Sequence, residues 1–151
     1  MTDSRPYVNA IRETGFSLLT EGKTLKIRAE GYSMYPAVKP GAVIYIEALP
    51  KNYLPLTGEI IAWKRKSGFV VHRVVRIIKN DDETEIVTRG DSCRYEDLPV
   101  AMEKLAGKVV KIETRSGTIV AEGSELISKP LYLYNRLMVW FIVRFKKLFN
   151  L

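Results

Sequence analysis

Cysteine and histidine are almost absent from this chain of 151 residues, and their scarcity excludes several kinds of site. The single cysteine, Cys93, cannot form a disulfide within the chain, and a zinc site built from four cysteines is impossible. The single histidine, His72, excludes any site that requires two imidazoles, including the metalloproteases that hold zinc with two histidines on one helix. We therefore expect no metal site and no cofactor.

Acidic residues are missing after Glu125, whereas five of the positive charges lie beyond it. The net charge is +7, so the rest of the chain carries only +2. The basic C-terminal segment is also rich in aromatic and aliphatic residues, a combination that favours an anionic membrane surface over a nucleic acid as partner. We expect a peripheral membrane protein on the cytoplasmic face, where anionic lipid is concentrated and a single unpaired cysteine stays reduced.

Apolar runs long enough to span a membrane are also lacking, because a spanning helix needs about 20 mostly apolar residues. Within 129–151 the apolar side chains follow a helical spacing that polar and basic residues interrupt. This pattern predicts a basic amphipathic helix lying in the plane of the membrane interface. A helix docked on the protein's own core or on a partner is the alternative. The side chains expected to contact the membrane are Trp140, Phe141, Arg144, Lys146 and Lys147.

The remainder of the chain divides into a short N-terminal helix, residues 1–23, and a β domain, residues 24–128. The first segment has no basic stretch followed by an unbroken apolar core, so it is not typical of a signal peptide. In the second segment, short alternating strands are separated by turn residues, with no repeated helical crossovers. The pattern predicts a mainly β fold, a closed or partly open antiparallel β-barrel. The expected strands are 24–29, 42–48, 60–64, 69–78, 84–88, 107–113 and 118–122.

A turn that could present a serine hydroxyl lies at Gly31-Tyr32-Ser33-Met34-Tyr35-Pro36. Glycine at position 31 permits a close backbone approach or an unusual φ, and Pro36 restricts the conformation of the residue before it. Neighbouring backbone N–H groups in such a turn could hold a developing oxyanion. By itself the pattern is equally typical of an ordinary turn serine.

A candidate base and its acidic partner lie further along the chain. Strand alternation places His72 on one face of the segment 69–78 and Arg73 on the other. A lone histidine among apolar residues is most often a core residue, but a serine nucleophile needs an adjacent base, and imidazole suits that role. A carboxylate bonded to the second ring nitrogen would orient the imidazole. Asp97 and Asp91 are the candidates, although Asp91 follows a glycine and is as easily a turn residue.

Together these segments resemble the type I signal peptidase superfamily, most closely its serine–histidine branch from the endoplasmic reticulum and archaea. The likeness runs from about Leu25 to Ile112 and is carried by Ser33-Met34-Tyr35-Pro36, Gly58-Glu59-Ile60-Ile61, Val71-His72-Arg73-Val74-Val75, Thr88-Arg89-Gly90-Asp91 and Gly107-Lys108-Val109-Val110. It implies the fold of that superfamily and an extended peptide or preprotein substrate, cleaved near a membrane through an acyl-enzyme. By this likeness Ser33 is the nucleophile, His72 the general base, Asp97 the acid that orients it and Asp91 a supporting aspartate.

One position departs from the pattern of the superfamily. Signal peptidases typically carry a serine two residues before the nucleophile, where its hydroxyl helps to form the oxyanion hole, whereas this chain has Gly31. The Gly-x-Ser-Met form is similar to the self-cleaving repressor peptidases, which share the fold. We expect Gly31 and Met34 to lie at the substrate and oxyanion side of Ser33, with backbone N–H groups forming the hole.

The residues leave three other functions open. A non-catalytic, membrane-peripheral binding module could keep the fold, and Gly31 is the motive for this alternative. A self-cleaving transcriptional regulator is disfavoured, because the 32 residues before Ser33 are too few for a helix-turn-helix domain with a linker. A thiol pair of Cys93 with His72 is disfavoured because the serine motif accounts for more of the residues.

Overall fold

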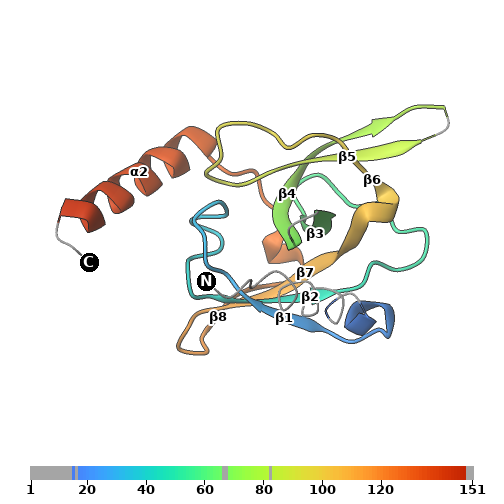
Figure 1. Cartoon of the computed structure of the whole chain (residues 1–151), viewed down its shortest axis with the longest axis horizontal. Coiled ribbons are helices and arrows are strands. Elements are labelled where there is room, and N and C mark those ends of the chain that lie inside the picture. The colour runs from blue at the N-terminus through green and yellow to red at the C-terminus, as the bar shows by residue number, and fades with distance from the viewer. Residues whose placement is uncertain (1–14, 16, 66–67, 82, 149–151) are drawn as a thin grey trace, which may run out of the picture.

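The computed structural model describes residues 15, 17–65, 68–81 and 83–148. These residues form a mainly β structure, an open antiparallel sheet of eight strands with a C-terminal helix (Figure 1). The elements are β1 (Leu25–Arg28), β2 (Val43–Glu47), β3 (Ile60–Arg65), β4 (Gly68–Lys79), β5 (Thr84–Arg89), β6 (Val100–Ala101), η1 (Met102–Lys104), β7 (Leu105–Glu113), β8 (Ile119–Glu122), η2 (Gly123–Leu126) and α2 (Tyr132–Leu148).

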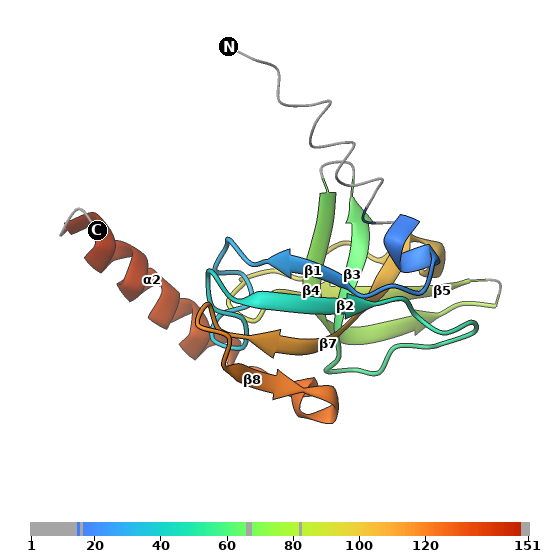
Figure 2. The same ribbon diagram turned by 90° about the horizontal axis from the view of Figure 1, so that it is seen from below.

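The sheet follows the order β1-β2-β7-β3-β4-β5-β6, and β8 pairs with β7 outside this path. One edge of β7 pairs with β2, while its other edge pairs first with β3 and then with β8. Figure 2 shows β1, β2, β7 and β8 lying next to one another in that order. Strands β1 and β6 lie at the two ends of this path and do not pair with each other in the described residues. The sheet is therefore open rather than closed.

The seven strands expected from the sequence are all present, with ends that differ by at most two residues. The two-residue strand β6 was missed, because alternation cannot be recognised over so short a segment. Of the predicted N-terminal helix, residues 15 and 17–20 are helical, whereas 1–14 and 16 lie outside the described residues. The predicted C-terminal helix is present as α2, and 149–151 lie outside the described residues.

The larger apolar core anchors the turn that carries Ser33. Met34, only 4% exposed, packs into this core together with Val38, Ile44 and Ile46. Burial of a methionine or leucine side chain contributes about 1.5–3 kcal/mol, so the turn is tied to β2 by its own apolar neighbour. A smaller cluster on β3, β4 and β5 consists of Ile61, Val74 and Ile86.

We expect Gly107→Ala to destabilise the fold. A Cβ at Gly107 would collide with the carbonyl oxygen of Glu47 and lie 2.8 Å from Cγ2 of Ile46, so β2 and β7 would have to separate. Such overpacking costs about 1–3 kcal/mol, which urea denaturation would measure. Gly31→Ala is the matched control, because no atom lies within 4 Å of its added Cβ. Equal unfolding free energies for the two variants would contradict this account of the strand packing.

Candidate functional site

His72 and Asp97 form the closest pair of candidate residues. His72 lies on β4 and Asp97 in the loop after β5, and Nδ1 of the imidazole is 2.6 Å from Oδ2 of the carboxylate. The N–H of Asp97 donates to the carbonyl oxygen of Thr88 at 2.8 Å, which holds the loop against the end of β5. A carboxylate can only accept, so Nδ1 carries a proton, and in the neutral imidazole Nε2 is the nitrogen with the lone pair. The contact that the resemblance implies is therefore present.

Two opposing effects set the pKa of Asp97. Burial raises the pKa of this carboxyl, but hydrogen bonds from His72 and Thr88 outweigh burial and leave the pKa below its ordinary value. Asp97 is consequently an anion at neutral pH. In this form it can stabilise a positive charge on the imidazole.

The turn of Ser33 meets His72 across Gly90. A Cβ at Gly90 would lie 2.7 Å from the carbonyl oxygen of Ser33 and 3.1 Å from Nε2 of His72. Only glycine allows these two segments to approach so closely. The N–H of Ser92 donates to the carbonyl oxygen of Ser33 at 2.9 Å, and its hydroxyl donates to that of Tyr32 at 2.6 Å. The segment 90–92 thus holds the backbone of the Ser33 turn beside the imidazole.

The Ser33 hydroxyl itself is not engaged. It is half-buried and has no hydrogen-bond partner among the residues that the structure describes, so the expected bond to His72 is not formed. Catalytic hydrogen bonds are often long in an empty site and tighten when substrate binds. A pocket of about 150 Å³ lies beside Ser33, and its lining combines small and aliphatic residues with one aromatic and one acidic residue: Ala29, Gly31, Met34, Val38, Ile44, Val71, Phe69 and Glu30. The pocket can accept a small apolar side chain.

Gly31 does not use the conformational freedom that glycine permits. Its φ is not left-handed, and an added Cβ would meet no atom within 4 Å outside the adjacent residues, so neither the unusual φ nor the close backbone approach occurs here. Gly31 and Met34 both line the pocket beside Ser33. The side chain of Met34, however, is buried in the core, so it contributes the wall of the pocket rather than an exposed contact.

Asp91 is paired with Arg73. Nε and Nη2 of Arg73 donate to the two carboxylate oxygens at 2.8 and 2.7 Å, and both side chains are almost completely buried. Nη1 of Arg73 donates to the carbonyl oxygens of Gly58 and Leu126 at 2.7 and 2.5 Å. Asp91 therefore supports the site by fixing the loop after β5. Sequence reasoning missed the partner, because arginine is rarely buried and the sequence does not show which carboxylate meets it.

Helix α2 is attached to this same loop. The side-chain amide of Asn135 donates to the carbonyl oxygen of Asp91 at 3.1 Å, and the guanidinium of Arg89 lies 3.8 Å from the ring centroid of Tyr132. Beyond its first turn the helix projects away from the sheet (Figures 1 and 2). No helix in the described ranges is long and apolar enough to cross a membrane. The large apolar side chains exposed on α2 are Leu133, Tyr134, Leu137, Trp140, Phe141, Phe145 and Leu148.

Cys93 lies close to Gly90 but is poorly suited to be a nucleophile. Its Sγ would be 2.6 Å from a Cβ at Gly90. Burial raises the pKa of the thiol, and the charge of Asp97 raises it further, so the reactive thiolate is disfavoured. Across the described residues, no group of three or more histidine, cysteine or acidic side chains could hold a metal ion.

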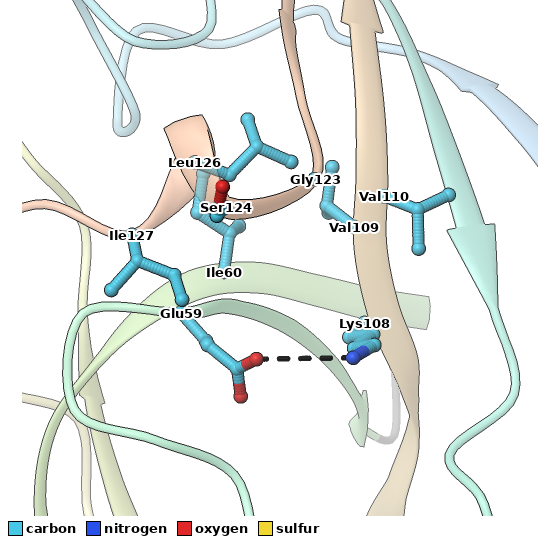
Figure 3. A pocket seen from close by; sticks show the side chains of 9 residues that line it. All are labelled: Glu59, Ile60, Lys108, Val109, Val110, Gly123, Ser124, Leu126 and Ile127. Carbon is cyan, nitrogen blue, oxygen red and sulfur yellow. Dashed lines mark ion pairs between the residues drawn. The ribbon is translucent and has the colours of Figure 1, made fainter.

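A second pocket, of about 250 Å³, lies away from Ser33 between β7 and η2. Figure 3 shows the carboxylate of Glu59 facing the ammonium group of Lys108, 3.9 Å away. The two oxygens of Glu59 already accept hydrogen bonds from the Tyr53 hydroxyl at 2.6 Å and the Leu56 N–H at 2.8 Å. Since its polar groups are occupied, this cluster is structural.

Comparison with known proteins leaves the interpretation to the geometry. No family model matches the chain, and no curated protein matches it significantly.

We expect the buried pair of Arg73 with Asp91 to be far more important for stability than an exposed pair. Arg73→Met would leave the Asp91 carboxylate buried without a partner, at a cost of about 3–5 kcal/mol. The matched control is Arg76→Met, which removes a pair with Glu96 whose side chains are 55% and 39% exposed. That change should cost about 0–1 kcal/mol. Denaturant unfolding compares the variants, and similar losses would contradict the assignment of Arg73.

Proposed function

We propose that this chain is a serine endopeptidase with the fold of the signal peptidases, cleaving an extended peptide or precursor near a membrane. The observation that carries the proposal is the position and hydrogen bonding of the His72 imidazole. Its Nδ1 is 2.6 Å from Oδ2 of Asp97, and its Nε2 and the carbonyl oxygen of Ser33 both lie beside Gly90, at 3.1 and 2.7 Å from a Cβ placed there. An oriented imidazole near a serine whose hydroxyl makes no hydrogen bond in the described residues suits nucleophilic catalysis once substrate brings the two together.

The proposed reaction has two halves. Nε2 of His72 takes the proton of the Ser33 hydroxyl as Oγ bonds to the peptide carbonyl carbon, and Asp97 stabilises the resulting imidazolium. The imidazolium then gives this proton to the leaving amine as the C–N bond breaks, which leaves an ester on Ser33. Water hydrolyses the ester with His72 again acting as base. Backbone N–H groups of the Ser33 turn would hold the oxyanion, since Gly31 has no hydroxyl to offer.

The substrate would bind as an additional strand. In the described residues β1 pairs only with β2, so its other edge is open to an extended peptide. Residues 29–31, which follow β1, and Phe69 and Val71 of β4 all line the pocket beside Ser33. A peptide placed between them would put a small side chain, such as that of alanine, into a space of about 150 Å³ next to the scissile bond.

Helix α2 would place the enzyme on an anionic membrane surface. Its exposed apolar side chains can enter the lipid, while Arg144, Lys146 and Lys147 reach the headgroups. The segment after Glu125 has no acidic residue to oppose this attraction. Because anionic lipid is concentrated in the cytoplasmic leaflet, we propose that α2 attaches to that leaflet.

Vesicle co-sedimentation tests this attachment. The chain should bind vesicles that contain phosphatidylglycerol more strongly than vesicles of phosphatidylcholine alone, and added salt should weaken the binding. The double variant Leu137→Ser, Phe141→Ser should lose most of it. Leu56→Ser is the control, because Leu56 is 56% exposed, close to the values for Leu137 and Phe141, but lies in a loop of the β domain. A concentration-dependent dimer with no vesicle binding would indicate that α2 instead packs on a second copy.

We expect a fluorophosphonate probe to label Ser33 and the label to depend on His72. Ser33→Ala and His72→Ala should each abolish labelling and peptide cleavage without unfolding the chain, because neither side chain belongs to the apolar core. Cys93→Ala should keep both activities. Ser128→Ala is the control for an exposed serine elsewhere. Absence of labelling in the folded wild-type chain would favour the alternative, a non-catalytic membrane-peripheral binding module that keeps the fold.

A further inference from the structure

A chain of hydrogen bonds continues behind Asp97 into the sheet. Nε1 of Trp63 lies 3.1 Å from Oγ1 of Thr88, which lies 2.6 Å from Oδ2 of Asp97. The indole N–H can only donate, and the hydroxyl has a single hydrogen. The direction of the chain is therefore determined: Trp63 donates to Thr88, and Thr88 donates to Asp97. Oδ2 of Asp97 thus accepts from Thr88 as well as from Nδ1 of His72.

The sheet register explains how these side chains meet. Paired residues of neighbouring strands direct their side chains to the same face, and so do residues two apart on one strand. Ile61 pairs with His72, and Val74 pairs with Thr88. Trp63 and His72 therefore share one face of the sheet with Thr88, across β3, β4 and β5.

Thr88 has no role in the proposed reaction so far, although it is completely buried. A buried hydroxyl is costly unless it is hydrogen-bonded. The Thr88 hydroxyl accepts one hydrogen bond from Trp63 and donates the other to the Asp97 carboxylate. That carboxylate is 24% exposed, so it could otherwise rotate or bind water in place of the imidazole. The Thr88 hydroxyl holds Oδ2 in the direction of His72.

We propose that Thr88 is a positioning residue that orients Asp97 toward His72, and that Trp63 sets the direction of the Thr88 hydroxyl. This inference rests on the proposed function for its effect on catalysis. The hydrogen-bond arrangement itself can be tested without a substrate. Neither residue lines the pocket beside Ser33, so both would act through Asp97.

Carboxyl ¹³C NMR provides the test that needs no activity. The hydrogen bond from Thr88 is one of the causes that lower the pKa of Asp97. Thr88→Val has the same shape but no hydroxyl, so the pKa of Asp97 should rise, whereas Thr88→Ser should keep it low. Thr84→Val, on the same strand, is the control and should leave the pKa of Asp97 unchanged. An unchanged pKa of Asp97 in Thr88→Val would overturn the inference.

Imidazole ¹⁵N NMR gives a second readout. Because the sequence contains one histidine, its ring signals belong to His72 without ambiguity. The wild-type chain should show the neutral imidazole protonated at Nδ1, and Thr88→Val should broaden or shift the Nδ1–H signal. Trp63→Phe should produce a smaller change in the same direction. Signals identical to wild type in both variants would count against the arrangement.

Peptide cleavage then tests the effect on catalysis. Thr88→Val should lower kcat about tenfold with little change in KM, since a hydrogen bond to a charged group of this kind corresponds to about one power of ten. Thr88→Ser should restore kcat, and Thr84→Val should not alter it. If Ser33 proves to be catalytic and Thr88→Val keeps the wild-type kcat, the inference about Thr88 would be overturned while the proposed function would stand. Absence of cleavage in the folded wild-type chain would overturn the proposed function while the NMR result still stands.

Discussion

The site depends on the hydrogen bonds that the buried guanidinium of Arg73 makes. Arg73 sits on β4 directly after His72 and bonds both oxygens of Asp91 together with the carbonyl oxygens of Gly58 and Leu126. A buried charge is tolerated only when its hydrogen bonds are satisfied, so each of these segments has to stay where it is. The loop that follows β5 is therefore fixed relative to the strand that carries the imidazole.

Gly90 converts this fixed loop into a contact between two distant parts of the chain. Its lack of a side chain lets the Ser33 turn and His72 both approach Gly90 closely, and Ser92 then holds the backbone of the turn. Helix α2 is bonded to the next residue, Asp91, through Asn135. The loop after β5 and helix α2 are consequently joined, so a surface that binds α2 would also determine how the Ser33 turn is oriented toward it.

The candidate site is rigid in one half and open in the other. The imidazole, Asp97 and Thr88 form a continuous hydrogen-bonded series on one face of the sheet. The Ser33 hydroxyl has no hydrogen bond among the described residues, and the space around Gly31 is open. A peptide that fills the neighbouring pocket would supply the missing contacts. This division fits the proposed peptidase, in which the base would be oriented in advance and the nucleophile would be aligned by the substrate.

The sequence by itself determined seven of the eight strands, the C-terminal helix and the identities of Ser33, His72 and Asp97 as candidates, because alternation, turn residues and motifs are local properties of the chain. Only the tertiary structure decided that the sheet is open, that Arg73 pairs with Asp91, and that Thr88 and Trp63 stand behind Asp97. These features depend on strand register and on contacts between residues far apart in sequence. A buried arginine or threonine is compatible with many partners, and the register of β3, β4 and β5 selects one of them.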